Sequence, residues 1–455
     1  MEWRNCAGAC VAAHPPVPNR CAERRLDRFA GARDGGGVTA KRKQAGQEKI
    51  AADVLIVGGG MVGMTLALAL ANAGVVVVLC DRESPDERQD AAYDGRTSAI
   101  AWGSSRVLSG IGLWQAMEPL AEPIREIRVS DGPSLLFLHY RHEEVGNHPL
   151  GHIIENRETR RILVAGLQSS AYAKHLAPVR IVSLVRDPAG VHATLADGRE
   201  IEAALVVAAD GRDSGLRRET GIAVTEWSYP QTGIVCTIVH ERPHHGVAHE
   251  RFLPAGPLAV LPMTSGANGE HRSSIVWTEY ARLAPALLAR DDATFSAELE
   301  RRFGPYLGKL RIEGRRWAYP LALLHAERYT DTRLALIGDA AHAIHPIAGQ
   351  GLNLGLRDVA ALAEILVDAH RLGLDLGGGD LLARYQRWRR FDNVALMVAT
   401  DALNRLFSNS VPLVRFVRDV GLGLVNELPP LRRLFMRHAM GVVGELPRLT
   451  RGERL

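Results

Sequence analysis

The chain has 455 residues, of which 46% are hydrophobic and 23% charged, with a formal net charge of +4. These values describe a soluble globular protein with two or more structural units around a large core. Its five cysteines show no metal or disulfide spacing, which excludes a disulfide scaffold and favours a reducing cytoplasm.

Charge is distributed unevenly along the chain. Residues 1–50 contain ten basic and five acidic residues, residues 51–379 contain 32 and 39, and residues 380–455 contain thirteen and seven. A basic end is usually a solvated surface, and it can also meet anionic lipid or an acidic partner. Residues 1–50 lack the apolar stretch of a signal peptide and show no periodicity. We therefore expect a disordered, dispensable extension that derives from a start codon placed too early.

The stretch from residue 53 to residue 83 predicts a strand, a glycine turn, a helix and a second strand. Gly58, Gly60 and Gly63 have the spacing of a dinucleotide-binding turn. The first glycine permits the tight turn, the second lets a pyrophosphate approach the backbone, and the third lets the helix pack on the strands. The helix N-terminus would face the phosphates with free N–H groups. Asp81 ends the second strand, where a carboxylate can accept hydrogen bonds from a ribose.

The same stretch has a second interpretation, because residues 54–80 carry no charge and are long enough to span a bilayer. Three consecutive glycines, a further glycine at Gly74 and β-branched residues at both ends fit a buried parallel βαβ unit better. We therefore reject the transmembrane interpretation.

Apolar periodicity and turn residues predict the remaining elements. We expect a polar loop at 84–93, a helix near 104–111, strands within 125–140 and at 152–156, and a helix at 157–171. Strands follow at 179–184, 191–195 and 200–205, and a buried strand runs from 205 to an Asp-Gly turn at 210–211. Strands of a second sheet are expected at 233–240, 251–253, 258–261 and 274–278, followed by a helix at 295–303, a strand at 334–337 and a helix at 352–370. A glycine triplet at 377–379 then breaks the chain, and the rest is predicted to be helical.

A second glycine-rich segment follows the predicted strand at 334–337. This strand delivers Gly338 and Asp339 to the carboxyl edge of the sheet, where α/β folds bind ligands. In the loop beyond, Gly349 and Gly351 expose backbone N–H groups. The helix that begins near Leu352 points its positive end at the same place, which favours an anion by about 0.3–1 kcal/mol.

Three signatures together resemble the class A flavoprotein monooxygenases, which are aromatic hydroxylases with a para-hydroxybenzoate-hydroxylase-like fold. In chain order they are Gly58-x-Gly60-x-x-Gly63 with an acid at 81, Ala209-Asp210-Gly211-x-x-Ser214-x-x-Arg217, and Gly338-Asp339-Ala-Ala-His342. The resemblance covers residues 53 to about 370. Within the class, residues 250–262, residues 345–358 and the C-terminal helices look like the ubiquinone-biosynthesis hydroxylases of the 2-polyprenyl-6-methoxyphenol hydroxylase type.

The resemblance implies a fold and a domain order. The fold class is α/β, with a Rossmann-like FAD-binding fold, an inserted mixed β-sheet substrate domain and C-terminal helices. The expected segments are a disordered extension at 1–50, FAD-binding parts at 51–130, 151–228 and 326–379, substrate-domain strands at 131–150, a substrate-domain sheet at 229–325 and a helical region at 380–455.

The resemblance also implies a set of cofactor-binding residues. The first motif would hold the FAD pyrophosphate and, through Asp81, the adenosine ribose, and the second is linked to FAD and nicotinamide binding. Asp339 would hold the ribityl or pyrophosphate region, Arg96 the pyrophosphate or flavin side, and residues 349–353 the pyrimidine edge of the isoalloxazine, with Asn156 as a further contact. The full set is Gly58, Gly60, Gly63, Asp81, Arg82, Arg96, Asp210, Gly211, Gly338, Asp339, Gly349, Gln350, Gly351, Leu352 and Asn353.

One residue departs from the family pattern. The ribose acid of the family is usually glutamate, whereas Asp81 is one methylene shorter and Glu83 lies two residues on. The strand pleat puts both on one face. Asp81 has the better spacing, and the choice between the two stays open at this point.

The implied reaction is hydroxylation of the ring of a polyprenylphenol in ubiquinone biosynthesis. NAD(P)H would reduce FAD, O2 would react with it, and a flavin hydroperoxide would transfer one oxygen atom to the electron-rich ring. We see no second dinucleotide unit, in agreement with a class whose nicotinamide donor has no Rossmann domain of its own. No catalytic dyad is evident: His342 and His345 are candidates for proton handling, although a structural role is favoured for each. We expect no metal and no nucleic acid.

Two other functions fit parts of the pattern. A flavin-dependent dehydrogenase or reductase of an isoprenoid, such as a geranylgeranyl reductase, would share the FAD motifs without coupled oxygen consumption. A non-catalytic scaffold in a quinone-biosynthesis complex would keep FAD as a structural ligand, but an intact Asp339 and residues 349–353 argue against it. NAD(P)H-driven oxygen uptake with and without a prenylphenol separates the three.

The C-terminal region combines apolar helical faces with thirteen arginines and no lysine. Interfacial helices share these features. We therefore expect a cytoplasmic protein with a peripheral contact to the inner face of the cytoplasmic membrane, and with partners in a quinone-biosynthesis complex. Packing of the apolar faces on the FAD-binding domain or on a partner subunit is the alternative.

Overall fold

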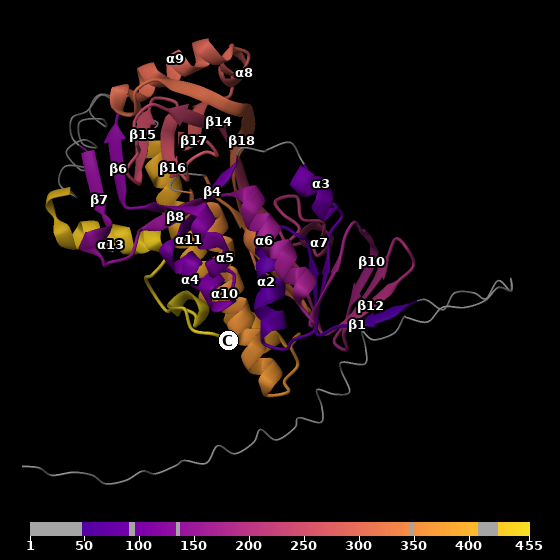
Figure 1. The fold of residues 1–455 in the computed structure, drawn as a ribbon. Helices are drawn as coiled ribbons and strands as arrows, with labels where there is room; N and C mark the ends of the chain where they lie inside the picture. Colours follow the sequence, from indigo (N-terminus) through magenta and orange to yellow (C-terminus); the bar gives the residue numbers. More distant parts are fainter. Residues whose placement is uncertain (1–47, 91–95, 133–136, 346–348, 408–425) are drawn as a thin grey trace, which may run out of the picture.

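The structure is a computed structural model that describes residues 48–90, 96–132, 137–345, 349–407 and 426–455. These residues form four β-sheets with helices between and around them. An eight-stranded sheet lies at one end of the molecule and a four-stranded sheet at the other, with the helices α2, α6 and α10 between them (Figure 1). None of the described helices combines the length and apolar character that crossing a bilayer requires.

A six-stranded sheet carries the three glycine motifs. Its order is β19-β20-β13-β2-β3-β9, and its strands run parallel except at the β19 edge. The strands are β2 (Val54–Val57), β3 (Val77–Cys80), β9 (Ala173–Leu176), β13 (Leu205–Ala208), β19 (Thr330–Asp331) and β20 (Leu334–Leu336). The four inner strands β2, β3, β13 and β20 are apolar without alternation because both faces of the sheet are covered there, whereas the edge strands β9 and β19 contain polar residues.

Three helices pack together on one side of this sheet. Helix α2 (Met61–Asn72) lies between α6 (Asn156–Ser169) and α10 (Gln350–Arg371), so it is buried on almost every side. This explains why its sequence is apolar all round. Gly355 of α10 permits the close approach of α2, since a Cβ there would lie 2.6 Å from Cγ2 of Val62.

The four-stranded sheet packs on the side of the parallel sheet away from these helices (Figure 1). Its strands are β1 (Lys49–Ala51), β10 (Ile181–Arg186), β11 (Val191–Leu195) and β12 (Glu200–Ala203). The prediction that the disordered extension reaches residue 50 is wrong for residues 49 and 50. They belong to β1, which pairs in parallel with β12, and Ile50 is only 4% exposed. The rest of that prediction falls on residues 1–47, which lie outside the described residues.

The eight-stranded sheet has the order β21-β18-β14-β17-β16-β15-β6-β7. Its strands are β6 (Glu126–Asp131), β7 (Phe137–Arg141), β14 (Val224–His240), β15 (Val247–Leu253), β16 (Gly256–Met263), β17 (His271–Tyr280), β18 (Leu310–Ala326) and β21 (His342–Ala343). Helices α8 (Ala284–Leu288) and α9 (Asp292–Phe303) cover its outer face (Figure 1). The strands extend past the predicted domain limits at 131 and 326, so the sheet and the FAD-binding parts are interleaved more closely than predicted.

Strand lengths in this sheet differ from the sequence prediction. All four predicted strands exist but are longer, and β18 was not predicted. The reason is proline: Pro230 lies where the pairing of β14 with β18 shifts register between Ser228 and Thr232, and Pro320 sits opposite Thr232. Proline in a strand indicates an end or a bulge, so the sequence predicts a strand end where the structure has one continuous strand.

A three-stranded sheet and two short helices connect the two large sheets. They are β4 (Thr97–Ala101), β5 (Ala121–Ile124), β8 (Gly151–Glu155), α4 (Trp102–Gly110) and α5 (Trp114–Met117). The predicted loop at 84–93 contains the short helix α3 (Pro85–Asp90), with proline at its first position; residues 91–95 are outside the described residues. The remaining helices are α7 (Gly215–Glu219), α11 (Gly379–Phe407) and α13 (Pro429–Met440).

Candidate active site

The turn after β2 has the geometry that its glycines predict. Gly58 has a φ of +111°, and a Cβ there would lie 2.2 Å from the carbonyl oxygen of Ala209. A Cβ on Gly63 would lie 2.0 Å from the carbonyl oxygen of Gly58. At Gly60, in contrast, a Cβ would meet no protein atom within 4 Å. The first and third glycines are therefore needed by the fold, while the second leaves open space above the turn.

Asp81 is fixed at the end of β3 by two backbone groups. Its Oδ2 accepts a hydrogen bond from the N–H of Gly59 at 2.7 Å, and its Oδ1 accepts one from the N–H of Glu83 at 3.0 Å. These two hydrogen bonds fix the orientation of the carboxylate at the edge of the sheet. Glu83 is exposed and lies 3.8 Å from Arg82. The geometry therefore favours Asp81 over Glu83 as the ribose ligand.

A cavity of about 520 Å³ opens in front of this turn. Asp210 lines it, and its Oδ2 accepts a hydrogen bond from the N–H of Gly215 at 2.8 Å. Its Oδ1 is buried and has no partner among the described residues. A buried carboxylate oxygen without a partner is costly, so a ligand hydroxyl or N–H group fits there. The predicted cofactor residues in the lining are Gly58, Gly60, Asp81, Arg82, Asp210 and Gly211.

The second and third motifs are held together by Arg217. Its Nη1 donates to the carbonyl oxygen of Ala340 at 2.8 Å, and its Nη2 donates to that of Arg212 at 2.7 Å. Ala340 ends the 3-10 turn η4 (Gly338–Ala340), which begins directly after β20. The second and third motifs, far apart in the chain, thus form one connected surface at the edge of the parallel sheet.

Asp339 occupies the middle of this turn and keeps an exposed side chain. The surrounding protein nevertheless desolvates the carboxyl and raises its pKa, while His342 and Arg212 oppose the shift. An acid in this position can accept hydrogen bonds from sugar hydroxyls without carrying a strongly hydrated charge. Its predicted contact with the ribityl or pyrophosphate region stays a prediction.

A buried carboxylate, Asp358 of α10, holds the same turn from behind. It accepts hydrogen bonds from the N–H of Gly338 at 3.1 Å, Nε of Arg389 at 2.9 Å and Nδ2 of Asn393 at 3.2 Å, and it lies 2.5 Å from Nε2 of His342. Burial raises the pKa of Asp358, but the charges and hydrogen bonds of His342 and Arg389 more than offset this and lower it to about 2. His342 therefore has a defined structural partner, as the favoured interpretation predicted.

His345 is different, because it is fully buried and neither ring nitrogen has a partner in the described part of the chain. Its ring packs edge-on against Tyr229, with 5.1 Å between the centroids. Burial lowers the pKa of His345 to about 4, with Asp401 opposing the shift. The imidazole is consequently neutral at pH 7, and it is not among the residues that line either large cavity.

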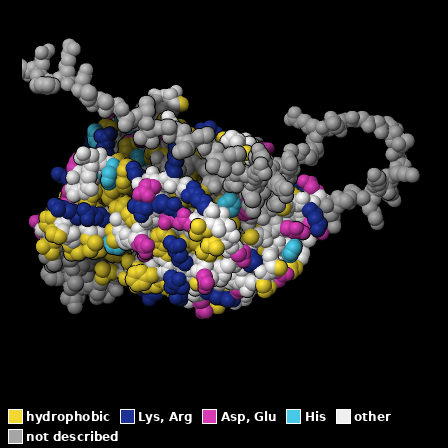
Figure 2. Space-filling model, turned by 90° about the horizontal axis from the view of Figure 1, so that it is seen from below, with side chains coloured by type: hydrophobic (Ala, Val, Ile, Leu, Met, Phe, Trp, Pro, Cys, Tyr) yellow, Lys and Arg dark blue, Asp and Glu magenta, His cyan; other side chains and the backbone are white. Residues whose placement is uncertain are grey.

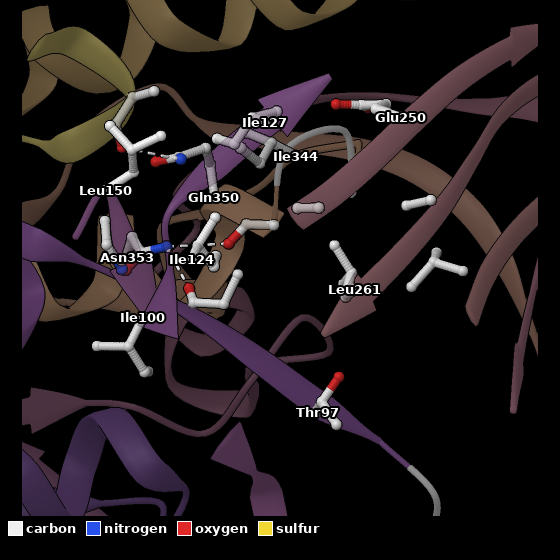
Figure 3. Close-up of a pocket in the computed structure, with 18 of the residues that line it drawn as sticks. Thr97, Ile100, Ile124, Ile127, Leu150, Glu250, Leu261, Ile344, Gln350 and Asn353 are labelled. Carbon is white, nitrogen blue, oxygen red and sulfur yellow. Dashed lines mark hydrogen bonds between the residues drawn. The ribbon is translucent and has the colours of Figure 1, made fainter. Parts of the chain in front are cut away.

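The loop at the start of α10 lies against β4. Gly349 has a φ of +60°, and a Cβ there would lie 2.8 Å from Cβ of Ala99. Nδ2 of Asn353 donates to the carbonyl oxygen of Ala99 at 2.7 Å, and its Oδ1 accepts the N–H of Ala101 at 2.8 Å (Figure 3). Asn353 therefore ties the helix to β4, which predicts an indirect role at the cofactor. A Cβ on Gly351 would meet no protein atom within 4 Å, so the backbone there is open to a ligand.

A second cavity, of about 450 Å³, extends from this loop to the eight-stranded sheet. Arg96 and Tyr319 lie in its wall, with the guanidinium carbon 5.4 Å from the ring centroid. Helix α13 closes it with Met436 and Met440, each 1% exposed. Figure 3 shows aliphatic side chains from several elements around the space. Most of the wall is apolar, and it includes Ile100, Ile124, Ile127, Val129, Leu150, Val235, Ala248, Ala259, Leu261, Val276 and Ile344.

Ten of the fifteen predicted cofactor residues line one of the two cavities, and the other five do not: Gly63, Gly338, Asp339, Gly351 and Leu352. Arg96, Asn156, Gly349, Gln350 and Asn353 line the second cavity. The sequence analysis missed the residues that come from β7, β15, β18 and α13, because their positions depend on sheet order. One indication of this cavity was present in the sequence, because residues 250–262 resemble the ubiquinone-biosynthesis hydroxylases.

These features fit FAD. Open space above Gly60 suits a pyrophosphate, the unpartnered oxygen of Asp210 and the carboxylate of Asp81 suit an adenosine, and the exposed backbone at Gly351 suits the pyrimidine edge of a flavin. Asp339 adjoins Ala340, whose carbonyl oxygen accepts a hydrogen bond from Arg217, and Arg217 also donates to the carbonyl oxygen of Arg212 in the wall of the second cavity. The described residues contain no cluster that could hold a metal ion.

Comparisons with known proteins agree with this geometry. Residues 51–398 match the family model described as FAD binding domain. The chain is 54% identical to the ubiquinone hydroxylase UbiL of Rhodospirillum rubrum, over 86% of this chain and 89% of that protein. It is 33% identical to the 3-demethoxyubiquinol 3-hydroxylase of Escherichia coli, over 85% and 98%. It is 30% identical to the mouse mitochondrial ubiquinone biosynthesis monooxygenase COQ6, over 89% and 94%.

Solved structures show the same fold. The p-nitrophenol 4-monooxygenase PnpA of Pseudomonas putida superposes with a TM-score of 0.71 at 21% identity, covering 86% of this chain and 97% of that chain. PqsL of Pseudomonas aeruginosa, a probable FAD-dependent monooxygenase, superposes with a TM-score of 0.68 at 25% identity, covering 82% and 99%. The predicted α/β architecture with an inserted mixed sheet is confirmed.

Proposed function

Because the chain belongs to the FAD binding domain family of flavin-dependent hydroxylases, we propose that it hydroxylates the ring of a polyprenylphenol in ubiquinone biosynthesis. It is an FAD-dependent monooxygenase, with NAD(P)H as electron donor and O2 as oxygen source. The ring substrate is inferred from the relatives named for ubiquinone biosynthesis, and the cavity beside the Gly349 loop supports it.

The observation that carries the proposal is the character of this cavity. It begins at the backbone of the flavin-facing loop and continues along an apolar sheet face to the buried methionines of α13. Its volume of about 450 Å³ falls within the range of pockets that enclose small aromatic ligands. An aromatic ring with an apolar chain matches such a wall, whereas a charged sugar or nucleotide substrate does not.

The chain's own residues contribute binding, orientation and dryness. When bound, FAD supplies the redox and oxygen-transfer chemistry. The turns at Gly58 and Gly338 would hold FAD, and the N–H groups at the start of α10 would stabilise negative charge on the flavin. The apolar wall excludes water from the place where oxygen is transferred, which protects a reactive species from hydrolysis.

The test is oxygen consumption coupled to product formation. The purified protein with FAD should consume O2 and NAD(P)H faster with a short-chain 2-prenylphenol than without it, and a hydroxylated product should appear. Ala259→Phe, which fills the cavity, should lower product formation at least tenfold while FAD content is kept. Ala267→Phe, on an exposed loop, is the matched control. Flavin reduction without hydroxylated product in the parent protein would instead support the reductase alternative.

We also propose that α13 brings the cavity to a membrane surface. One face of the helix buries Met436 and Met440 in the cavity, while Leu434 and Phe435 on the other side are 47% and 45% exposed. Arg433 and Arg437 are exposed on the same helix. Seen from below, hydrophobic and basic side chains lie next to each other on this side of the molecule (Figure 2). An apolar tail could thus pass from lipid to the ring site along one helix.

Flotation with anionic liposomes tests this contact. Replacing Leu434 and Phe435 with serine, or Arg433 and Arg437 with glutamine, should weaken binding, whereas serine at Leu372 and Leu374, which are exposed elsewhere, should not. Arg432 is left unchanged, because its guanidinium lies 2.7 Å from Glu144. If the α13 variants float as well as the Leu372 and Leu374 control, packing of α13 against a partner remains as the explanation. Arg415 and Arg418 belong to the same arginine-rich C-terminal region but lie outside the described residues. A quinone-biosynthesis complex stays a prediction.

A further inference from the structure

Helix α11 buries one side and exposes an apolar row on the other. The buried residues recur at helical spacing and pack toward α10, β19 and the eight-stranded sheet; they are Leu382, Tyr385, Arg389, Asn393, Met397, Thr400, Asn404 and Phe407. On the opposite side an outer row is formed by Phe391, Ala395, Val398 and Ala402, which are all exposed. Phe391 is 78% exposed and Val398 is 60% exposed. Because the solvent side of a helix is normally polar, this outer row indicates a surface that a partner covers.

Three arginines extend the outer row toward the start of the helix. Arg384, Arg387 and Arg390 are exposed, and none of them forms an ion pair within the described part of the chain. Asp392, the acid beside the row, is already bound to Arg389, with 2.8 Å between its Oδ2 and Nη1 of the arginine. The exposed side of α11 therefore has a positive half followed by an apolar half.

A hollow lies where the two halves meet. It has a volume of about 320 Å³ and is lined by Gln386, Arg387, Arg390, Phe391 and Val394. Two guanidinium groups beside an aromatic ring suit a carboxylate on a flexible apolar stem. The chemistry of this hollow matches a glutamate or aspartate side chain of a partner.

Two kinds of partner bind basic amphipathic helices, namely an anionic lipid surface and a complementary protein helix. The composition of the outer row favours the protein helix. Alanine projects little apolar volume into a bilayer, whereas between two helices Ala395, Ala399 and Ala402 allow the backbones to approach closely. The hollow at Phe391 likewise favours a shaped partner, because a fluid lipid surface does not require one.

We propose that the exposed side of α11 docks an amphipathic helix of a partner protein, whose apolar stripe ends in a cluster of acidic residues. The apolar stripe packs on the outer row, and the acidic cluster pairs with Arg384, Arg387 and Arg390. An acidic side chain of that cluster occupies the hollow beside Phe391. No residue of this surface lines either large cavity, so the inference is independent of the proposed function.

The test measures binding of two synthetic peptides to the full-length, FAD-loaded protein by fluorescence anisotropy. Each peptide has about 22 residues, which is about six helical turns, with leucines at every third or fourth position. The flanking positions are glutamate in the acidic peptide and lysine in the basic one. The parent should bind the acidic peptide at least about tenfold more tightly than the basic one, and this preference should shrink as salt is raised.

Variants of α11 locate the binding. Arg387→Glu together with Arg390→Glu should raise the dissociation constant for the acidic peptide at least about tenfold, and so should Phe391→Ser together with Val398→Ser. All four side chains are partly or largely exposed, so melting temperature and FAD content should match the parent's.

The matched controls change exposed residues on other elements. Arg282→Glu with Arg315→Glu reverses two charges, and Leu372→Ser with Leu374→Ser removes two apolar side chains. Both controls should bind the acidic peptide as the parent does.

Three results would overturn the inference. The first is equal binding of the two peptides by the parent, or unchanged binding in the variant of Arg387 and Arg390. The second is loss of flotation with phosphatidylglycerol liposomes in the variant of Phe391 and Val398 without any peptide preference in the parent, which would assign the surface to lipid. The third is a dimer of the parent in sedimentation velocity that this same variant cannot form, which would assign the surface to a second copy of the chain.

Discussion

Replacing Asp358 with asparagine should destabilise the protein by about 3–5 kcal/mol, because it leaves the buried charge of Arg389 without its main partner. Asp358 is completely buried and meets four groups, from Gly338, His342, Arg389 and Asn393. An asparagine keeps the shape but brings N–H groups toward donors. Because a folded domain is stable by about 5–15 kcal/mol, a loss of this size lowers the melting temperature by roughly 6–15 °C.

The same variant changes the response to acid. Because the folded-state pKa of Asp358 is lowered to about 2 from an ordinary value of 3.8, its ionisation contributes stability that is present above pH 4 and lost as pH falls toward 2. With asparagine this part of the acid dependence disappears. Melting followed by circular dichroism, between pH 3 and pH 7, measures both effects. FAD retention reports the turn at Gly338, whose N–H group loses its acceptor.

Asp392→Asn is the matched control. Asp392 also pairs with Arg389, at 2.8 Å, but its side chain is 39% exposed, so the expected loss is about 1 kcal/mol or less. A melting temperature of Asp358→Asn within about 2 °C of the parent would refute the argument, because Arg389 would then have been compensated by other groups.

Three further changes probe other parts of the chain. Gly60→Ala should fold normally but lose FAD on gel filtration, since its Cβ meets no protein atom yet projects into the space proposed for the pyrophosphate. The control Gly379→Ala, whose Cβ also meets no protein atom, should keep its FAD. Deletion of residues 1–50 should melt at a lower temperature than deletion of residues 1–47, because it removes most of β1 and a buried isoleucine worth about 1.5–3 kcal/mol. The parent should lose up to about 3 kcal/mol of unfolding free energy between pH 6.5 and pH 4 that His345→Leu does not lose, as measured by urea unfolding. The reason is that His345 takes up a proton in this pH range in the unfolded parent but not in the folded one, where the ring is buried.

What the sequence predicted well was local. The first glycine turn needs contacts only with its own strand, helix and next strand, so spacing alone identified Gly58, Gly60 and Gly63. The buried strands β13 and β20 were recognisable because both of their faces are covered, which leaves an unbroken apolar run. Spacing left Asp81 and Glu83 as alternatives for the ribose ligand, and the hydrogen bond from Gly59 favours Asp81.

What the sequence could not predict depended on contacts between distant segments. Asn353 was predicted to contact the flavin, and the structure shows that its amide group bonds to Ala99 and Ala101 of β4, which lie 254 and 252 residues earlier in the chain. Asp358 has no distinguishing local pattern, since its partners come from β20, β21 and α11. His342 and His345 are three residues apart, yet one is bound to Asp358 and the other has no partner among the described residues.

The lining of the second cavity likewise depends on contacts between distant segments, here through the pairing of strands in the eight-stranded sheet. In the segment from Ala248 to Phe252, alternate residues differ in their contacts: Ala248 and Glu250 line the cavity, whereas Arg251 bonds to the carbonyl oxygens at the end of α9. A register slip of one residue would exchange these roles and place an arginine in the cavity. The pairing of Glu250 with Val129 and Ala259, which belong to distant parts of the chain, therefore fixes which residues of this segment face the cavity. The lining of the cavity is in that sense a property of sheet register, and the part that residues 250–262 play in it can be assigned only when their neighbours across the sheet are known.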